Sequence, residues 1–216
     1  MVEITAAELL AAEKIFGDRL DLATRYVEHL ATSGTERGLI GPREAPRLWS
    51  RHVLNCAVIE CLIAEGSHVA DVGSGAGLPG LCLAIARPDL ELTLIEPLER
   101  RVIWLQEVVD DLGLDNVTIM RTRAELAVGM VNADVVTARA VSALSTLAGL
   151  TIPLLAGKGE VVAIKGRSAG EEIEKAAKVI RKLGGKQTSV VLVGEDLLEE
   201  PTTVVRIVVN KPQKIA

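Results

Sequence analysis

Short apolar runs alternate along most of the chain with segments in which apolar residues recur every three or four positions. The short runs predict seven strands, at residues 68–72, 91–95, 117–120, 133–138, 160–165, 189–193 and 203–209. The periodic segments predict helices at residues 81–86, 98–112, about 142–155 and 170–183. Strands that alternate with helices form parallel βαβ units, so the pattern predicts an α/β fold. The acidic turn at 194–201 is too short for a crossover helix, so we expect the last two strands to be antiparallel.

The first 64 residues follow a different pattern, of helices and loops without strands. Thr5 and Glu8 form a capping box before an apolar-periodic run, and Asp18 is placed to cap a second helix. After a loop rich in Gly and Pro at residues 33–44, Pro46 is placed to begin a third helix. We therefore expect one domain over residues 1–216, with an N-terminal helical extension at 1–64 and an α/β core at 65–216.

A glycine-rich loop directly follows the first predicted strand and reads Asp71-Val-Gly-Ser-Gly-Ala-Gly-Leu-Pro-Gly80. Residues without side chains let the backbone turn sharply and approach a ligand closely. The glycines fit two patterns: G-x-G-x-G at Gly73, Gly75 and Gly77, or the dinucleotide pattern G-x-G-x-x-G at Gly75, Gly77 and Gly80. The first pattern begins at the end of the strand, where such a loop belongs, and is therefore favoured.

Two acidic residues flank this loop in the predicted fold. Asp71 is expected to lie under the loop, near the ammonium or sulfonium group of a bound S-adenosylmethionine, where a pyrophosphate would be repelled. Glu96 ends the second strand, where an acid accepts hydrogen bonds from both ribose hydroxyls of a nucleoside. S-adenosylmethionine is therefore the predicted cofactor, with NAD as the alternative because both contain a ribose. In the other interpretation the two carboxylates cap helices or are solvated surface charges.

Further candidate residues follow the third and fourth strands. Ala124 and Glu125 are placed to contact an adenine, through the backbone and the carboxylate respectively, although Glu125 could instead open a short helix. Arg139 follows the fourth strand, where methyltransferases of this fold place groups that handle the substrate. Alternatively, Arg139 pairs with a carboxylate at the edge of the sheet, such as Glu125.

The composition limits the partners and the surroundings of the protein. The net charge of −5, from 24 Lys and Arg against 29 Asp and Glu, means that any RNA contact needs a local basic patch. Aromatic residues make up 2% of the chain, which disfavours a base-stacking platform. Cys56, Cys61 and Cys82 are unevenly spaced and predict neither a disulfide framework nor a metal site. Without a long apolar run or a secretory signal, we expect a cytoplasmic protein with no membrane partner.

The segment after the fourth strand bears on the acceptor of a methyl group. An Asn/Asp-Pro-Pro-aromatic sequence, typical of enzymes that methylate exocyclic amines, is replaced there by Arg139-Ala-Val-Ser142, so adenine N6 is disfavoured. Methylation of pyrimidine C5 needs a cysteine nucleophile, and no cysteine follows a strand opposite the glycine loop. A ring nitrogen with a free lone pair, such as guanine N7, needs only positioning and electrostatic stabilisation, which is consistent with a site that has no obvious base.

Four segments carry a family resemblance: residues 48–55 (LWSRHVLN), the loop 71–80 with its Gly-Leu-Pro-Gly ending, Arg123-Ala-Glu125, and Arg139-Ala. Together they resemble the RsmG family, also called glucose-inhibited division protein B, over nearly the whole chain. The resemblance implies the Rossmann-like fold of class I S-adenosylmethionine-dependent methyltransferases, with a seven-stranded, mostly parallel sheet whose last strand is antiparallel. It also implies methylation of N7 of a single guanine, position 527, of 16S ribosomal RNA, in the small ribosomal subunit or its assembly intermediate.

The resemblance also implies roles for individual residues. The cofactor contacts of the family correspond here to Gly73, Leu78, Ala124, Glu125 and Arg139. The loop pattern and the acids add Asp71, Gly75, Gly77 and Glu96. The candidates for holding RNA are Arg47, Arg51, His52, Lys165 and Arg167. In the alternative interpretation, these are solvated surface charges and His52 is a structural histidine. The chain departs from many family members at the RNA entrance, with Cys56 where a Ser is common and residues 36–43 where an Asn-Leu-Thr segment is more usual.

We expect a monomer that holds no metal. Three other functions stay open at this point: a small-molecule methyltransferase with the same cofactor site, an NAD-dependent oxidoreductase that uses the second glycine pattern, and a binding protein without catalytic activity. An RNA methyltransferase should gather positive charge around the mouth of its substrate pocket. A deep, closed acceptor pocket would favour a small molecule.

Overall fold

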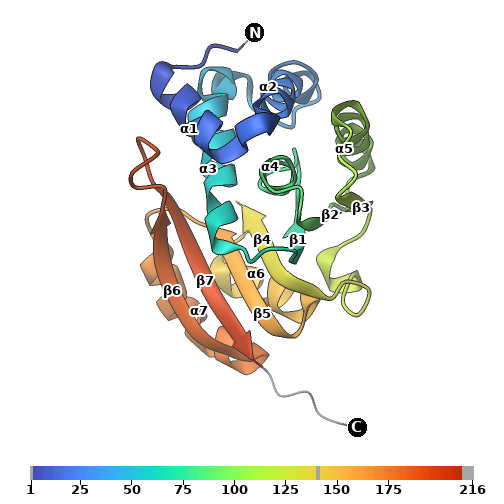
Figure 1. Ribbon diagram of the computed structural model, residues 1–216. Helices are drawn as coiled ribbons and strands as arrows, with labels where there is room; N and C mark the ends of the chain where they lie inside the picture. The colour runs from blue at the N-terminus through green and yellow to red at the C-terminus, as the bar shows by residue number, and fades with distance from the viewer. Residues whose placement is uncertain (1, 140–141, 211–216) are drawn as a thin grey trace.

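A seven-stranded sheet forms the centre of the computed structural model, which describes residues 2–139 and 142–210 (Figure 1). The strands are β1 (His68–Val72), β2 (Glu91–Ile95), β3 (Val117–Met120), β4 (Ala133–Arg139), β5 (Leu155–Ile164), β6 (Gly185–Val193) and β7 (Thr202–Asn210). Their order in the sheet is β3-β2-β1-β4-β5-β7-β6. The strands β1 to β5 pair in parallel, and β7 is antiparallel to both β5 and β6. The prediction of an antiparallel last strand is confirmed.

Two strands begin four or five residues earlier than the apolar pattern predicts, and β7 begins one residue earlier, at Thr202. β5 begins at Leu155 rather than at residue 160, and β6 begins at Gly185 rather than at residue 189. Residues 155–159 and 185–188, with which the two strands begin, include glycines and charged residues, so the apolar pattern that marks a strand is interrupted there. The backbone of these residues nevertheless pairs with the neighbouring strand. The register shifts between Ala133 and Val135 in the pairing of β4 with β5, and between Gly185 and Gln187 in the pairing of β6 with β7.

The sheet separates two hydrophobic clusters because successive side chains of a strand point to opposite faces. Val69 and Val135 contribute to one cluster, and their neighbours Ala70 and Val136 contribute to the other. α4 (Gly80–Ala86) and α5 (Glu99–Leu112) pack into the first cluster. The opposite face is covered by α6 (Leu144–Thr151) and α7 (Ala169–Leu183) (Figure 1). The helix predicted at 142–155 is shorter because a 3-10 turn that contains Pro153 follows it.

Residues 2–62 are largely helical. α1 (Ala6–Phe16) begins with the predicted capping box: Glu8 N donates to Thr5 Oγ1 at 3.2 Å, and Thr5 N donates to Glu8 Oε2 at 2.8 Å. The predicted cap at Asp18 is wrong, because a 3-10 turn (Gly17–Arg19) precedes α2 (Leu20–His29) and Arg19 stands at its N-cap without a side-chain bond.

The third helical segment also begins earlier than predicted, at Pro42 rather than at Pro46. The second helix continues from α2 into η2 (Leu30–Gly34), and the third segment consists of η3 (Pro42–Arg47), η4 (Leu48–Leu54), α3 (Asn55–Ala57) and η5 (Val58–Leu62). Pro42 follows an extended Gly41 and has no N–H to leave unpaired, so it can open a helix, and Pro46 is accommodated inside the 3-10 helix η3.

The extension packs into the same cluster as α4 and α5. Phe16, Tyr26 and Trp49 are buried together with Leu81 and Trp104. Asn55 donates to Thr202 Oγ1 at 2.7 Å, and the Thr202 hydroxyl donates to Asn55 O at 2.9 Å, which ties α3 to β7. The division into an extension at 1–64 and a core at 65–216 stays a prediction. Within the described residues, no helix is both long and apolar enough to cross a membrane.

Candidate cofactor and substrate site

The glycine loop leaves the carboxyl end of β1 in a backbone conformation that favours glycine. Gly73, Gly75 and Gly77 have φ angles of 69°, 58° and 81°. A side chain on Gly77 would also collide with Leu81, whose Cδ1 lies 2.4 Å from the position of the added Cβ. Gly73 N donates to Ile95 O at 2.9 Å, so the loop is held against the end of β2. The first glycine pattern therefore describes the three positions that shape this turn.

Asp71 lies under the loop and is completely buried. Its carboxylate accepts hydrogen bonds from Gly80 N at 3.1 Å and from Thr137 Oγ1 at 3.4 Å. A Cβ on Gly80 would lie 2.7 Å from Asp71 Oδ2, so this close approach requires glycine. Burial raises the pKa of Asp71 to about 6, although Ser74, Gly80 and Thr137 stabilise its charged form. The solvated-charge interpretation of Asp71 is wrong, and its bond to the first residue of α4 bears out the capping interpretation.

We expect Asp71→Asn to flatten the pH dependence of stability. Because the folded pKa of Asp71, about 6, lies above the ordinary value of about 3.9, folding loses stability as the pH rises through this interval. The free energy of unfolding of the variant, relative to wild type, should therefore rise between pH 4 and pH 7, by at most about 3 kcal/mol. Urea unfolding at several pH values measures this difference, and a constant difference would show that Asp71 does not titrate in this range.

Glu96 joins the glycine loop to the loop after β2. Its side chain is 1% exposed and accepts hydrogen bonds from Gly75 N at 3.0 Å and from Leu98 N at 2.9 Å. Arg101 Nη1 lies 3.4 Å from Glu96 Oε2. A carboxylate has about four acceptor positions, so these three contacts leave about one position for a hydroxyl donor. Glu96 is therefore not a solvated surface charge either.

The remaining predicted cofactor residues lie at the same edge of the sheet. Ala124 and Glu125 form a 3-10 turn with Leu126 after β3, with Ala124 buried and Glu125 exposed. Leu78 is buried within the glycine loop. Because β3, β2 and β1 are adjacent and parallel, the loops that follow them meet at one edge, where open α/β sheets bind ligands. Glu125 opens the short helix, as the alternative predicts, and this does not exclude a contact with a ligand.

Arg139 ends β4 and is held by the N-terminal extension. Its Nη2 lies 2.8 Å from His52 Nδ1, and its Nη1 donates to Cys56 Sγ at 3.0 Å and to His52 O at 3.5 Å. The alternative partner Glu125 is wrong, because the ion pairs of the described residues do not include Arg139 with Glu125. Residues 140 and 141 of the Arg139-Ala-Val-Ser142 segment lie outside the described residues.

The thiol of Cys56 is affected by this arginine. Burial acts to raise the pKa of Cys56, but hydrogen bonding to Cys82 and the charge and hydrogen bond of Arg139 outweigh it and leave the pKa below its usual value. Burial raises the pKa of Cys82 well above its usual value. The departure from Ser at position 56 therefore places a polarisable sulfur atom against Arg139.

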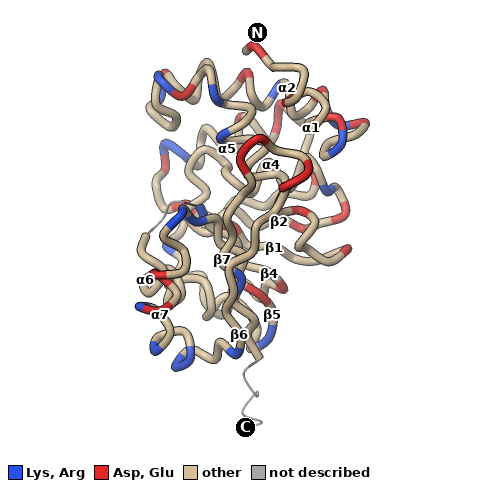
Figure 2. Tube along the Cα trace, turned by 90° about the vertical axis from the view of Figure 1, so that its left-hand side faces the viewer, with Lys and Arg blue, Asp and Glu red and all other residues tan. Residues whose placement is uncertain are grey.

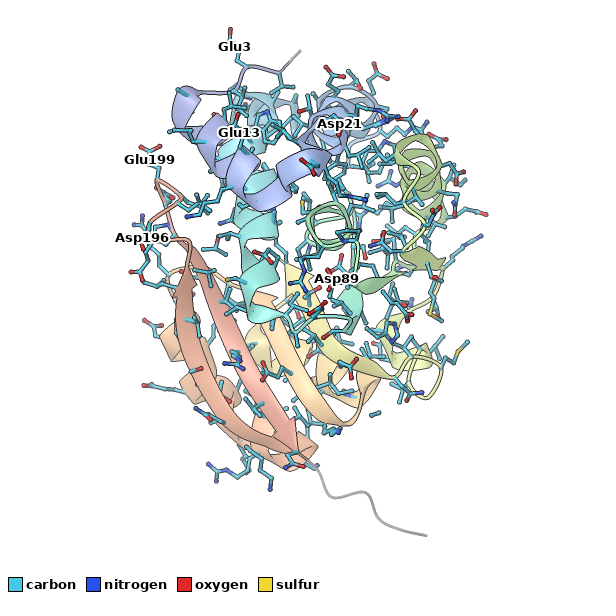
Figure 3. All side chains as sticks on the ribbon, in the orientation of Figure 1. Glu3, Glu13, Asp21, Asp89, Asp196 and Glu199 are labelled. Atoms are coloured by element: carbon cyan, nitrogen blue, oxygen red, sulfur yellow. The ribbon has the colours of Figure 1, made fainter. Side chains whose placement is uncertain are left out.

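A cavity of about 1070 Å³ opens beside Arg139. Four of the five candidate RNA-binding residues line it, namely Arg47, Arg51, Lys165 and Arg167. Its acidic lining residues are Glu8, Glu172, Glu199 and Glu200. With Arg139 the lining has five cations against four glutamates, so the expected gathering of positive charge is present only in part. The last two glutamates belong to the acidic turn between β6 and β7, where Figure 3 labels Asp196 and Glu199 and which Figure 2 shows in red.

The candidate RNA-binding residues differ in how free their charges are. Lys165 is largely buried, and its Nζ contacts Glu172 Oε2 and Ser142 O, each at 2.8 Å. Arg47 and Arg51 are more than half exposed, at 2.9 and 3.7 Å from Glu44. Arg167 is exposed, whereas His52 is buried and lies outside the residues that line the cavity. His52 is therefore a structural histidine in this arrangement, as the alternative predicts.

Sequence reasoning missed two residues that support the site. Tyr26 donates a hydrogen bond of 2.6 Å to Ala76 O, so α2 holds the glycine loop from behind. Burial raises the pKa of Tyr26 well above its usual value. Glu44 contacts Arg47, Arg51 and His52 together. Tyr26 is the single tyrosine of the chain, and this rarity was the one signal that could have drawn attention to it. Among the residues that the structure describes, no group of three His, Cys, Asp or Glu is placed to hold a metal ion.

Comparison with known proteins defines the fold further. A SAM-dependent methyltransferase from Aquifex aeolicus superposes with a TM-score of 0.51 at 18% identity, and the match covers 85% of this chain and 96% of that one. Fibrillarin of Aeropyrum pernix, solved with natively bound S-adenosyl-L-methionine, superposes with a TM-score of 0.53 at 20% identity, covering 73% and 74% of the two chains. These similarities confirm the fold of class I S-adenosylmethionine-dependent methyltransferases.

Closer relatives are recognised by sequence. Ribosomal RNA small subunit methyltransferase G of Arthrobacter sp. (strain FB24) is 92% identical over 216 residues, which is the full length of both chains. The protein of the same name from Streptomyces avermitilis is 54% identical over 201 residues, covering 93% of this chain and 84% of that one. The sequence profile of the family described as rRNA small subunit methyltransferase G, GidB, matches residues 19–200. Since the profile spans most of the chain and the relatives align along nearly all of it, the chain belongs to the rRNA small subunit methyltransferase G family.

Proposed function

We propose that the protein transfers a methyl group from S-adenosylmethionine to N7 of one guanine of 16S ribosomal RNA, position 527. The substrate is the small ribosomal subunit or its assembly intermediate, and the enzyme acts as a monomer in the cytoplasm. The observation that carries this proposal is the juxtaposition of two features at adjoining strand ends. The glycine loop and Glu96 lie at the ends of β1 and β2, and Arg139 lies at the end of β4, beside a cavity whose lining includes four further cations and four glutamates.

The residues at this edge fit S-adenosylmethionine. The backbone of Gly73, Gly75 and Gly77 leaves room for the methionine portion, and Glu96 retains acceptor capacity for a ribose hydroxyl. In this proposal Ala124 contacts the adenine through its backbone and Glu125 contacts it through its carboxylate. The cofactor supplies an electrophilic methyl group bound to a positively charged sulfur. Asp71 supports the loop from below and favours a positively charged ligand.

A dinucleotide fits this edge less well. In the dinucleotide pattern the pyrophosphate is bound by N–H groups at the start of the helix that follows the loop. Here Gly80 N, at the start of α4, already donates to the buried Asp71 carboxylate. A pyrophosphate would lose this donor and would approach a group that is negatively charged above pH of about 6. These contacts favour S-adenosylmethionine over NAD.

The acceptor chemistry does not require a base. Guanine N7 carries a lone pair and no proton, so attack on the methyl group needs alignment and a suitable electrostatic environment. Arg139 keeps its proton at any physiological pH and cannot remove one from the substrate. It can donate hydrogen bonds to guanine O6 or to a phosphate and so position the base. The exposed Arg47, Arg51 and Arg167 provide a local basic surface on an acidic protein.

The test is transfer of labelled methyl from S-adenosylmethionine to small ribosomal subunits that lack this modification, followed by mapping of the labelled base. Naked 16S RNA and assembly intermediates are assayed in parallel, because they distinguish the stage at which the substrate is recognised. We expect label on one guanine N7. Absence of label on every RNA, with cofactor binding confirmed by calorimetry, would refute the RNA substrate and favour a small-molecule methyltransferase.

A further inference from the structure

We propose that His52 positions Arg139 for methyl transfer, as the middle member of a chain of contacts Glu44–His52–Arg139 that connects the N-terminal extension to the end of β4. This proposal rests on the proposed methyltransferase function. It assigns to His52 a positioning role in place of the contact with RNA that the family resemblance implies. It also explains why a loop segment rich in Gly and Pro, at residues 33–44, is held close to the site.

The contacts determine which nitrogen of His52 carries the proton. Arg139 Nη2 lies 2.8 Å from His52 Nδ1, and a guanidinium has only donors, so Nδ1 must be the acceptor. Glu44 Oε2 lies 2.9 Å from His52 Nε2 on the other side of the ring, and a carboxylate accepts, so Nε2 must carry the hydrogen. His52 is therefore a neutral imidazole with one defined tautomer, and its two partners fix the orientation of the ring.

The surrounding charges favour the same protonation state. Burial lowers the pKa of His52, and Arg139 and Arg51 add to this effect, so that together they outweigh the bond to Glu44. The hydrogen bond from His52, together with Arg51 and Arg47, lowers the pKa of Glu44 and keeps it a carboxylate. Of the described charged groups, Glu44 faces the ring from η3, Arg51 from η4 and Arg139 from β4. A second proton on His52 would place two N–H groups against each other at 2.8 Å and would break the contact with Arg139.

Arg139 depends on this contact for its orientation. Its other acceptors are a cysteine sulfur at 3.0 Å, which accepts hydrogen bonds weakly, and a backbone carbonyl at 3.5 Å. Among the described residues, the imidazole is therefore its strongest acceptor. Arginine has many rotamers, so without this acceptor the Arg139 guanidinium would no longer be held in one orientation beside the cavity. The effect should appear in kcat more than in cofactor affinity, because most of the proposed cofactor contacts, among them Gly75 and Glu96, lie in the loops after β1 and β2.

The experiment compares His52→Ala with His52→Gln. A glutamine amide offers one acceptor and one donor, as the neutral imidazole does, but it does not gain a proton between pH 5 and 8. We expect His52→Ala to lower kcat at least about tenfold at pH 8. His52→Gln should retain most of the wild-type kcat at pH 8. We also expect the wild type to lose kcat/KM below the ordinary histidine pKa of about 6.5, and His52→Gln should remove this loss.

The matched control is His68→Gln. His68 begins β1 at the opposite edge of the sheet, where its ring contacts Thr93 and Asn132, so this variant should keep the wild-type pH profile. Nitrogen-15 resonances of the His52 ring in the wild type should show a protonated Nε2 and an unprotonated Nδ1. Their titration gives the pKa of His52 directly and separates it from that of Asp71. In Arg139→Ala this pKa should rise, because a positive neighbour is removed.

The outcomes distinguish the two proposals. If the wild type does not methylate RNA, the proposed function fails, whereas the tautomer and the effect of Arg139→Ala on the pKa still test the contact chain. If the wild type is active, full kcat in His52→Ala overturns the positioning role. If His52→Gln loses kcat/KM at acidic pH as the wild type does, the positioning role is overturned as well. If His52→Ala is unfolded, the pH profile of His52→Gln decides, because glutamine can retain both hydrogen bonds.

Discussion

Replacement of Arg139 by alanine is expected to reduce methyl transfer about 100-fold or more, while the protein stays folded. The guanidinium lies at the end of β4 beside the cavity, where it can donate to the acceptor base. Its partners are neutral or weakly polar groups of His52 and Cys56, so its removal leaves no buried carboxylate without a partner. The free energy of unfolding should therefore fall by only about 1–3 kcal/mol. Single-turnover methyl transfer and urea unfolding measure the two quantities.

Arg206→Ala provides the matched control for this prediction. Arg206 makes two hydrogen bonds of 2.6 Å to Glu160 on the pairing between β7 and β5, away from the cofactor edge. Its loss should affect stability and leave the rate of methyl transfer unchanged. If Arg139→Ala proves unfolded, the arginine has mainly a structural role, and the substrate-handling role must be abandoned.

The second large effect is expected from Gly73→Val, which should abolish detectable binding of S-adenosylmethionine. Gly73 has a φ of 69°, a conformation that a β-branched residue adopts only at a cost of about 1–2 kcal/mol. The valine side chain would also occupy the space that we assign to the ligand. Titration calorimetry with the cofactor measures the result, and unchanged affinity would count against the assignment of the loop.

Gly113→Val separates backbone strain from loss of the ligand site. Gly113 has a φ of 63° at the end of α5, and nothing lies within 4 Å of a Cβ built there. The two variants therefore carry a similar strain in the folded protein. We expect Gly113→Val to be destabilised and to bind the cofactor with wild-type affinity. If both variants lose binding, the loss in Gly73→Val reflects a general effect on folding.

Most of the sheet could be predicted because its strands are short, apolar and bounded by loops. β1, β2 and β3 have the predicted bounds at both ends. β5 and β6 do not, because their first residues pair through the backbone while glycines and charged side chains conceal the apolar pattern. The extension was harder to predict, since the segment from Pro42 to Leu62 changes between 3-10, π and α geometry under the influence of packing.

The cofactor edge could be predicted because parallel topology alone brings the loops after β1, β2 and β3 together. The partners of Arg139 could not be predicted in the same way. His52 and Cys56 lie 87 and 83 residues away along the chain, and their contacts depend on how the extension packs against the sheet. Local sequence patterns do not predict contacts between residues so far apart along the chain, so the contact of Glu44 with His52 was found only in the structure.

The hydrogen bond from Tyr26 to Ala76 makes the second helix and the glycine loop thermodynamically interdependent. Melting of α2 would remove the support behind the loop, so local opening of the N-terminus also lowers the population of the binding-competent site. The reverse follows by linkage: a ligand that binds only the intact loop adds free energy of RT ln(1 + [L]/Kd) against opening. Amide hydrogens in α2 would then exchange more slowly in the presence of cofactor, although this helix need not touch it.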